Sequence, residues 1–143
     1  MNTKAEKFQS FLEETKIDCF TNEEIKDELN SVAFRSRIEV EGQHLPMIII
    51  MDQSIYTMLR VQVSAKLVKD SNKNEILNYI NDLNSKFKVF KYYVTEEGDL
   101  CLDSCILSTD DAFDGRMVQT VLDVVLKHLV EQYPILMRKI WAN

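Results

Sequence analysis

The stretch that decides the fold class is Leu59-Arg60-Val61-Gln62-Val63-Ser64-Ala65-Lys66-Leu67, in which apolar and polar side chains alternate at every position. Successive side chains of a β-strand point to opposite faces of the sheet, so this pattern buries one face and leaves the other in water. The stretch therefore predicts a strand whose Leu and Val side chains face a core and whose Arg, Gln and Lys side chains face outward.

Two further strands are predicted on the N-terminal side of this stretch. Residues 32–40 alternate in the same way, whereas residues 45–51 are nearly all apolar and rich in isoleucine. An unbroken apolar strand is typical of a position that is central in a sheet or covered on both faces. Short polar turns at 41–44 and 52–54 connect the three strands, which predicts an antiparallel meander.

The period changes to that of a helix on the C-terminal side. From Asn74 onward, apolar residues at Ile76, Ile80, Leu83 and Phe87 share one face. Two strands are predicted next, at 89–95 and 100–107, joined by a hairpin turn in which Gly98 supplies the positive φ that such turns need.

Helices are predicted at both ends of the chain. Residues 3–16 carry Phe and Leu at helical spacing, and Thr21 with Glu24 forms a capping-box pattern that predicts a second, short helical turn. A long helix is predicted to start at the cap Thr109, and Pro134 is predicted to break or kink it. Residues 135–141 are then expected to form one more short helix.

Together these elements predict an α+β fold. We expect an antiparallel five-stranded sheet with helices packed on it, in the order α-β-β-β-α-β-β-α. Because single domains commonly run ~100–200 residues, the 143 residues are expected to form a single domain, 1–143.

Composition and charge exclude several classes of partner. The net charge is -6, which opposes binding to nucleic acid phosphates and to anionic lipid. Arg35, Arg37, Arg60 and Lys66 are predicted to lie on the outer face of the sheet, but this face lacks the aromatic residues that single-stranded nucleic acid prefers. We therefore expect neither nucleic acid nor membrane as a partner.

The cysteine count predicts the compartment. Three cysteines, an odd number, fit reduced thiols better than a disulfide framework. The first residues contain no apolar signal core, and the longest apolar run, near Met47–Met51, is far too short for a membrane span. The expected localisation is cytoplasmic.

Candidate catalytic and metal-binding residues are few. Cys101 and Cys105 are four apart on one predicted strand, at a separation of roughly 13 Å that excludes a disulfide, and are expected to be small buried apolar residues. Cys19 has no base nearby in the sequence, and a Cys–His dyad assembled in space stays an open alternative. His44 is predicted to lie in a solvated turn, and His128 near a helix C-terminus that favours its protonated form.

No cofactor site is expected. With glycine only at 42, 98 and 115, neither a phosphate-binding loop nor a dinucleotide fingerprint can be formed. An acidic stretch in residues 13–28 has two interpretations, a solvated face or a contact with a basic partner. We expect no catalytic residue, no metal and no cofactor.

The C-terminal segment is the candidate for a binding surface. Trp, Met and Arg are enriched at protein interfaces, and this segment contains all three. The alternative is ordinary packing onto the core. The predicted partner-binding residues are Ile135, Leu136, Met137, Ile140 and Trp141.

Three phrases of the sequence resemble the YbjN-like family: residues 76–84 (ILNYINDLN), 87–92 (FKVFKY) and 97–102 (EGDLCL). This resemblance implies a fold similar to type III secretion chaperones, with a twisted antiparallel sheet, helices and usually a dimeric assembly. Members of the family have been described as regulators of sensory transduction. The resemblance implies no catalytic residues.

The sequence therefore predicts a non-enzymatic protein-binding module. We expect a chaperone- or adaptor-like regulator, forming a homodimer, that holds a protein or peptide on its sheet or in a helix-lined groove. The alternative is a regulatory domain that senses a small ligand in a pocket between helix and sheet.

Overall fold

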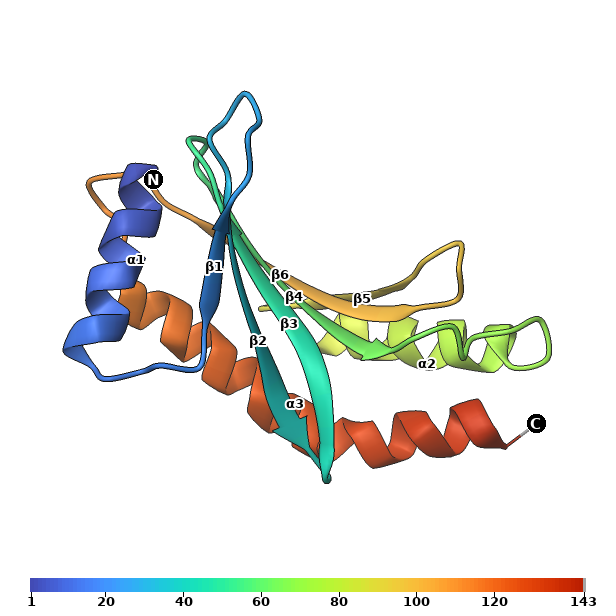
Figure 1. Cartoon of the computed structure of the whole chain (residues 1–143). Coiled ribbons are helices and arrows are strands. Elements are labelled where there is room, and N and C mark those ends of the chain that lie inside the picture. Colours follow the sequence, from blue (N-terminus) through green and yellow to red (C-terminus); the bar gives the residue numbers. More distant parts are fainter. Residues whose placement is uncertain (143) are drawn as a thin grey trace.

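The computed structural model of the chain describes residues 1–142 and is an α+β fold (Figure 1). In these residues three helices accompany one antiparallel sheet of six strands, in the spatial order β1-β2-β3-β4-β6-β5. The elements are α1 (Thr3–Glu14), β1 (Thr21–Glu24), β2 (Val32–Val40), β3 (Gln43–Met51), β4 (Tyr56–Ser64), α2 (Lys73–Lys86), β5 (Lys91–Val94), β6 (Leu100–Leu107) and α3 (Gly115–Trp141).

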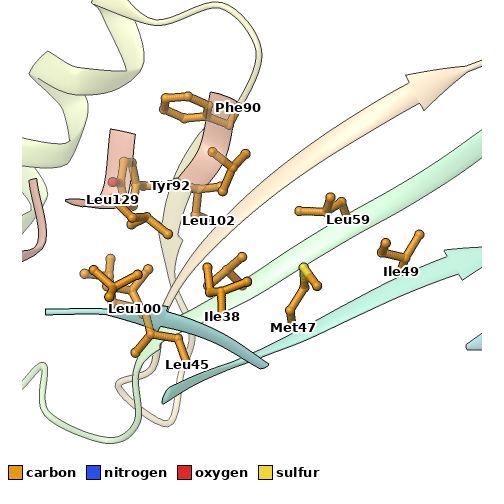
Figure 2. Packing of buried hydrophobic residues seen from close by; sticks show 14 of the residues in the cluster. Ile38, Leu45, Met47, Ile49, Leu59, Phe90, Tyr92, Leu100, Leu102 and Leu129 are labelled. Carbon is orange, nitrogen blue, oxygen red and sulfur yellow. The ribbon is translucent and has the colours of Figure 1, made fainter. Parts of the chain in front are cut away.

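The core lies between one face of the sheet and the helices. Alternate residues of each long strand are buried, as the period of two predicts; on β3, for example, Leu45, Met47, Ile49 and Met51 are buried. Figure 2 shows side chains of β2, β3, β4 and β6 gathered in one cluster with Tyr92 of β5 and Leu129 of α3. All three helices contribute buried residues to this same cluster.

The sheet has six strands, and the predicted five is wrong. Residues 21–24 form β1, which pairs antiparallel with residues 32–35 of β2, where a short helical turn was expected. The turn between them is closed by Ile25 N–H donating to Ser31 O (2.8 Å) and by Ser31 N–H donating to the Asp27 carboxylate (2.9 Å). The element order is therefore α-β-β-β-β-α-β-β-α.

Helix α3 is one element, and the separate helix predicted at 135–141 is wrong. It begins after Asp114, whose carboxylate accepts from Arg116 N–H (2.9 Å), and not at Thr109. It continues through Pro134, which cannot donate a backbone hydrogen bond. Leu129, Leu136 and Ile140 are all buried, and this burial on both sides of the proline offsets the missing bond.

The predicted bounds of two strands also change. Strand β4 ends at Ser64, because the register slips between Gln62 and Ser64 and Lys66 takes a positive φ of 58°. Strand β5 is limited to Lys91–Val94 rather than 89–95. The strand predicted at 100–107 is confirmed as β6.

Helix α1 is fixed to the sheet by two buried polar side chains. Asn2 caps the helix by accepting from Ala5 N–H (2.9 Å) and donates to the backbone oxygens of Asn30 (2.9 Å) and Met51 (2.8 Å). Lys4 is fully buried, and its Nζ donates to Tyr56 O (2.7 Å) and Thr57 Oγ1 (3.3 Å). Burial lowers the pKa of the Lys4 ammonium.

Candidate functional site

The outer face of the sheet is the candidate site, because the helices pack on the other face (Figure 1). On β3, Met47 and Ile49 point inward and are 4% and 0% exposed. Their neighbours Ile48 and Ile50 point outward and are only half-buried. The unbroken apolar run of 45–51 did predict a central strand, but within the described chain no helix covers its outer side.

The strand register places apolar and basic side chains side by side on this face. Arg35, Ile48, Arg60 and Asp103 occupy directly opposed positions across β2, β3, β4 and β6. The next row along the strands is apolar and consists of Ala33, Ile50, Met58 and Cys105. Arg35, Arg37 and Arg60 lie on the outer face as the sequence predicts, and Lys66 lies beyond the end of β4.

A shallow hollow of about 390 Å³ opens on this face. Its lining combines residues 46–48 of β3 with charged and amide residues of the neighbouring strands β2 and β4. Its lining residues are Arg35, Ser36, Arg37, Pro46, Met47, Ile48, Arg60 and Gln62.

One of the three arginines is fully paired. The Arg60 guanidinium donates Nε and Nη2 to the two carboxylate oxygens of Asp103, at 2.9 Å each, and its Cζ lies 5.5 Å from the centre of the Tyr93 ring. These hydrogen bonds raise the pKa of Arg60 above its ordinary value. Burial raises the pKa of Tyr93 to about 12, so its hydroxyl stays neutral.

The other two arginines keep charge available at the surface. Arg35 Nη2 lies 3.9 Å from Glu23 Oε1, and both side chains are more than half exposed, so this pair is weak. Arg37 is exposed and has no carboxylate within ion-pair distance among residues 1–142. The hollow therefore has a positive side formed by β2.

The structure divides the five predicted partner-binding residues. Leu136 and Ile140 are 0% and 3% exposed and belong to the core, so they cannot contact a partner in this fold. Ile135 and Met137 are half-buried. Trp141 is 67% exposed and is the one residue of the five with a largely free side chain.

A second apolar surface runs along the C-terminal half of α3. Val130, Pro134, Met137 and Trp141 follow one another at helical spacing, so they share one side of the helix. Val130 and Trp141 are exposed, and the two residues between them are half-buried. We call these four residues the α3 stripe.

His128 lies in a different environment from the one predicted. Because α3 continues to Trp141, His128 is in the middle of the helix and is buried. Its Nε2 is 2.8 Å from the Tyr92 hydroxyl, and its ring packs 4.5 Å and 4.2 Å from the ring centres of Phe87 and Phe90. Burial lowers the pKa of His128 to about 4, so the imidazole is neutral at pH 7.

The remaining candidates are the three cysteines and His44. All three cysteines are free; Cys101 is buried as expected, whereas Cys105 and Cys19 are exposed. His44 is exposed as predicted, but it lies in β3 opposite Glu39, so its predicted place in a turn is wrong. Within residues 1–142 no three His, Cys, Asp or Glu side chains are grouped closely enough to ligate a metal ion.

Nothing in the described part of the chain qualifies as a transmembrane helix by length and apolar character. Neither a protein-family model nor a curated protein sequence matches the chain.

Proposed function

We propose that this chain is a non-enzymatic, chaperone- or adaptor-like module that binds a protein through the outer face of its sheet. The observation that supports this most directly is the row of outward isoleucines, Ile48 and Ile50, on a central strand that the chain's own helices leave uncovered. Exposed apolar patches surrounded by polar residues are typical of protein-binding surfaces.

Charge favours an acidic partner segment. The whole chain carries a net charge of -6, yet Arg35 and Arg37 bring positive charge to one side of the hollow. Complementary charge steers association and selects among partners, and arginine pairs well with carboxylates. We therefore propose a segment with an apolar side chain over Pro46 and Ile48 and a carboxylate near Arg37.

The resemblance to the YbjN-like family supports the same class of function. We therefore also propose membership of this family, a type III secretion chaperone-like fold, a homodimer and a cytoplasmic location. The free thiols Cys19 and Cys105 are exposed, which agrees with a reducing compartment.

Site-specific photo-crosslinking in cells tests the proposed face. A benzoylphenylalanine in place of Ile48 lies in the hollow, and one in place of the exposed Ser10 on α1 is the matched control. We expect a protein adduct from position 48 and none from position 10. The adduct should disappear when Arg37→Glu is added, because the positive side of the hollow is then reversed.

Three results would contradict the proposal: no adduct at position 48, equal adducts at both positions, or an adduct indifferent to Arg37→Glu. An adduct of twice the mass of the chain would identify a second copy as the bound protein. Circular dichroism of each purified variant confirms that the fold is retained.

A further inference from the structure

A pocket of about 200 Å³ lies on the helix side of the sheet, away from the outer face. It is enclosed by α1, by the turn that follows α1, by β3 and by the first half of α3. Three phenyl rings, Phe8, Phe11 and Phe20, form one part of its wall, and aliphatic side chains such as Ile17, Ile49 and Leu122 form the rest.

Local structure holds these walls in place. Two residues beyond the end of α1, Lys16 takes a positive φ of 57°, and Ile17 N–H donates back to Leu12 O (2.9 Å). This C-terminal cap turns the chain across the end of α1, as left-handed caps do. Where α3 meets α1, a Cβ on Gly115 would lie 2.6 Å from Phe11 Cγ, so the glycine allows the two helices to touch directly.

The size and lining of the pocket define the apolar part of a ligand. Apolar cavities of roughly 150 Å³ lined by Leu, Ile and Phe bind benzene, so this pocket has room for about one ring. Phe8 and Phe20 meet edge to face, with ring centres 5.8 Å apart. A further aromatic ring is well suited to such a wall, because offset and edge-to-face pairs are the favoured arrangements.

The mouth of the pocket defines the polar part of the ligand. Gln119 and Asp123 are one helical turn apart on α3, and both line the pocket. Asp123 is exposed, and no cation of residues 1–142 lies within ion-pair distance of its carboxylate. A ligand with an ammonium group two or three bonds from its ring would therefore find an acceptor at the mouth.

We propose that this pocket binds a small amine carrying one aromatic ring, with the ring among Phe8, Phe11 and Phe20 and the ammonium at Asp123. The proposal goes beyond the proposed function, since it concerns a separate site and a different class of ligand. The purified chain tests it without any protein partner.

Methyl NMR of the full chain with labelled isoleucines is the test. The probes are 2-phenylethylamine, the neutral 2-phenylethanol and the anionic 3-phenylpropionate, each added up to about 10 mM, since ligands this small bind weakly. We expect saturable shifts at Ile17 and Ile49, which line the pocket. Ile48 on the outer face and Ile80 on the buried face of α2 are internal controls whose signals should not shift.

The variant Asp123→Asn isolates the charge without disturbing the core. It should weaken the binding of 2-phenylethylamine by about threefold, the effect of an exposed ion pair. The binding of 2-phenylethanol should be unchanged. Asp111→Asn is the matched control, because Asp111 is exposed and does not line the pocket. The proposal is overturned if no probe shifts Ile17 and Ile49, if the amine binds no tighter than the acid, or if Asp123→Asn leaves the amine affinity unchanged.

Discussion

His128 makes stability depend on pH. Its pKa is about 4 in the folded chain, whereas an unfolded histidine titrates near 6.5. Between these values the unfolded state binds more protons, so the free energy of unfolding falls as the pH drops from about 6.5 to about 4. We expect a loss of about 2–3 kcal/mol over this window, measured by urea unfolding at a series of pH values.

Two histidine variants separate this effect from the titration of carboxylates. His128→Gln removes the titrating group and should flatten the pH dependence by the stated amount. His44→Gln changes an exposed histidine and should leave the wild-type dependence intact. If both variants follow the wild-type curve, His128 does not carry the effect.

Lys4 is a buried cation whose hydrogen bonds go to neutral oxygens, at Tyr56 and Thr57. Replacing a buried charge by an apolar side chain of similar volume is often neutral or stabilising, whereas truncation leaves a cavity. We therefore expect Lys4→Met to keep or raise the free energy of unfolding. Lys4→Ala should lower it by about 2–3 kcal/mol.

Urea unfolding at pH 7 measures both Lys4 variants. The free energy of unfolding should be higher for Lys4→Met than for Lys4→Ala, and an equal decrease in both variants would contradict this prediction. Neither Lys4 nor His128 could be predicted as buried from the sequence. Helical spacing identified the apolar face of each helix, but burial of a polar neighbour depends on which strands lie opposite.

At the scale of elements, two glycines in turns provide a matched pair. Gly42 and Gly98 both have positive φ, 77° and 88°. A Cβ on Gly42 meets nothing within 4 Å, whereas one on Gly98 would lie 2.5 Å from Val68 O. Gly42→Ala should cost about 1 kcal/mol of backbone strain, and Gly98→Ala about 1–3 kcal/mol more, as is usual for a steric clash.

Thermal unfolding of the two glycine variants under identical conditions gives this difference. Equal melting temperatures would show that the close contact at Gly98 relaxes without cost. The sequence did identify the turn at Gly98 from its position between two strands, and the positive φ confirms it. The close approach to Val68 joins segments 30 residues apart and has no local signal.

Strand β1 shows where local patterns fail. Thr21 and Glu24 have the spacing of a helix cap, yet the segment pairs with β2. A capping box adds about 1 kcal/mol to a helix, whereas the paired strand completes hydrogen bonds with a neighbour already held in the sheet. The long strands and helices, by contrast, were predictable because each has its own unbroken period of apolar residues.

For the whole molecule, the α3 stripe is the surface that fits the proposed homodimer. We expect the chain to elute as a dimer in size-exclusion chromatography with light scattering. The double variant Val130→Lys with Trp141→Lys should elute as a monomer, because two exposed apolar positions then carry like charges. Truncation after Tyr133 is a poorer test, since it also removes the core residues Leu136 and Ile140.

Ser10→Lys, an exposed change on α1 and away from the stripe, is the control and should stay dimeric. A monomeric wild type, or a double variant that remains dimeric, contradicts the assignment. The sequence predicted an apolar C-terminal surface but not its residues. The packing of the whole helix against the sheet decides which side of α3 faces the core. This packing buries Leu136 and Ile140.

The outer face of the sheet could likewise be predicted only in part from the sequence. The alternation of Arg35 and Arg37 with buried neighbours was enough to place these arginines outward. The run from Leu45 to Met51 has no alternation, so it could not show that one side of β3 stays uncovered. That fact depends on all three helices packing on one face, a property of the complete chain.

Strand β2 is longer than its outer neighbour β1, and this difference in length has a consequence for aggregation. Strand β1 pairs only with residues 32–35, so residues 36–40 of β2 have no partner strand on that side among the described residues. Unpaired strand edges recruit other chains, and charged side chains oppose this. Arg37 and Glu39 are both exposed on the open segment. Their charges therefore oppose edge-to-edge strand pairing between copies of the chain, the step by which a fibre would form.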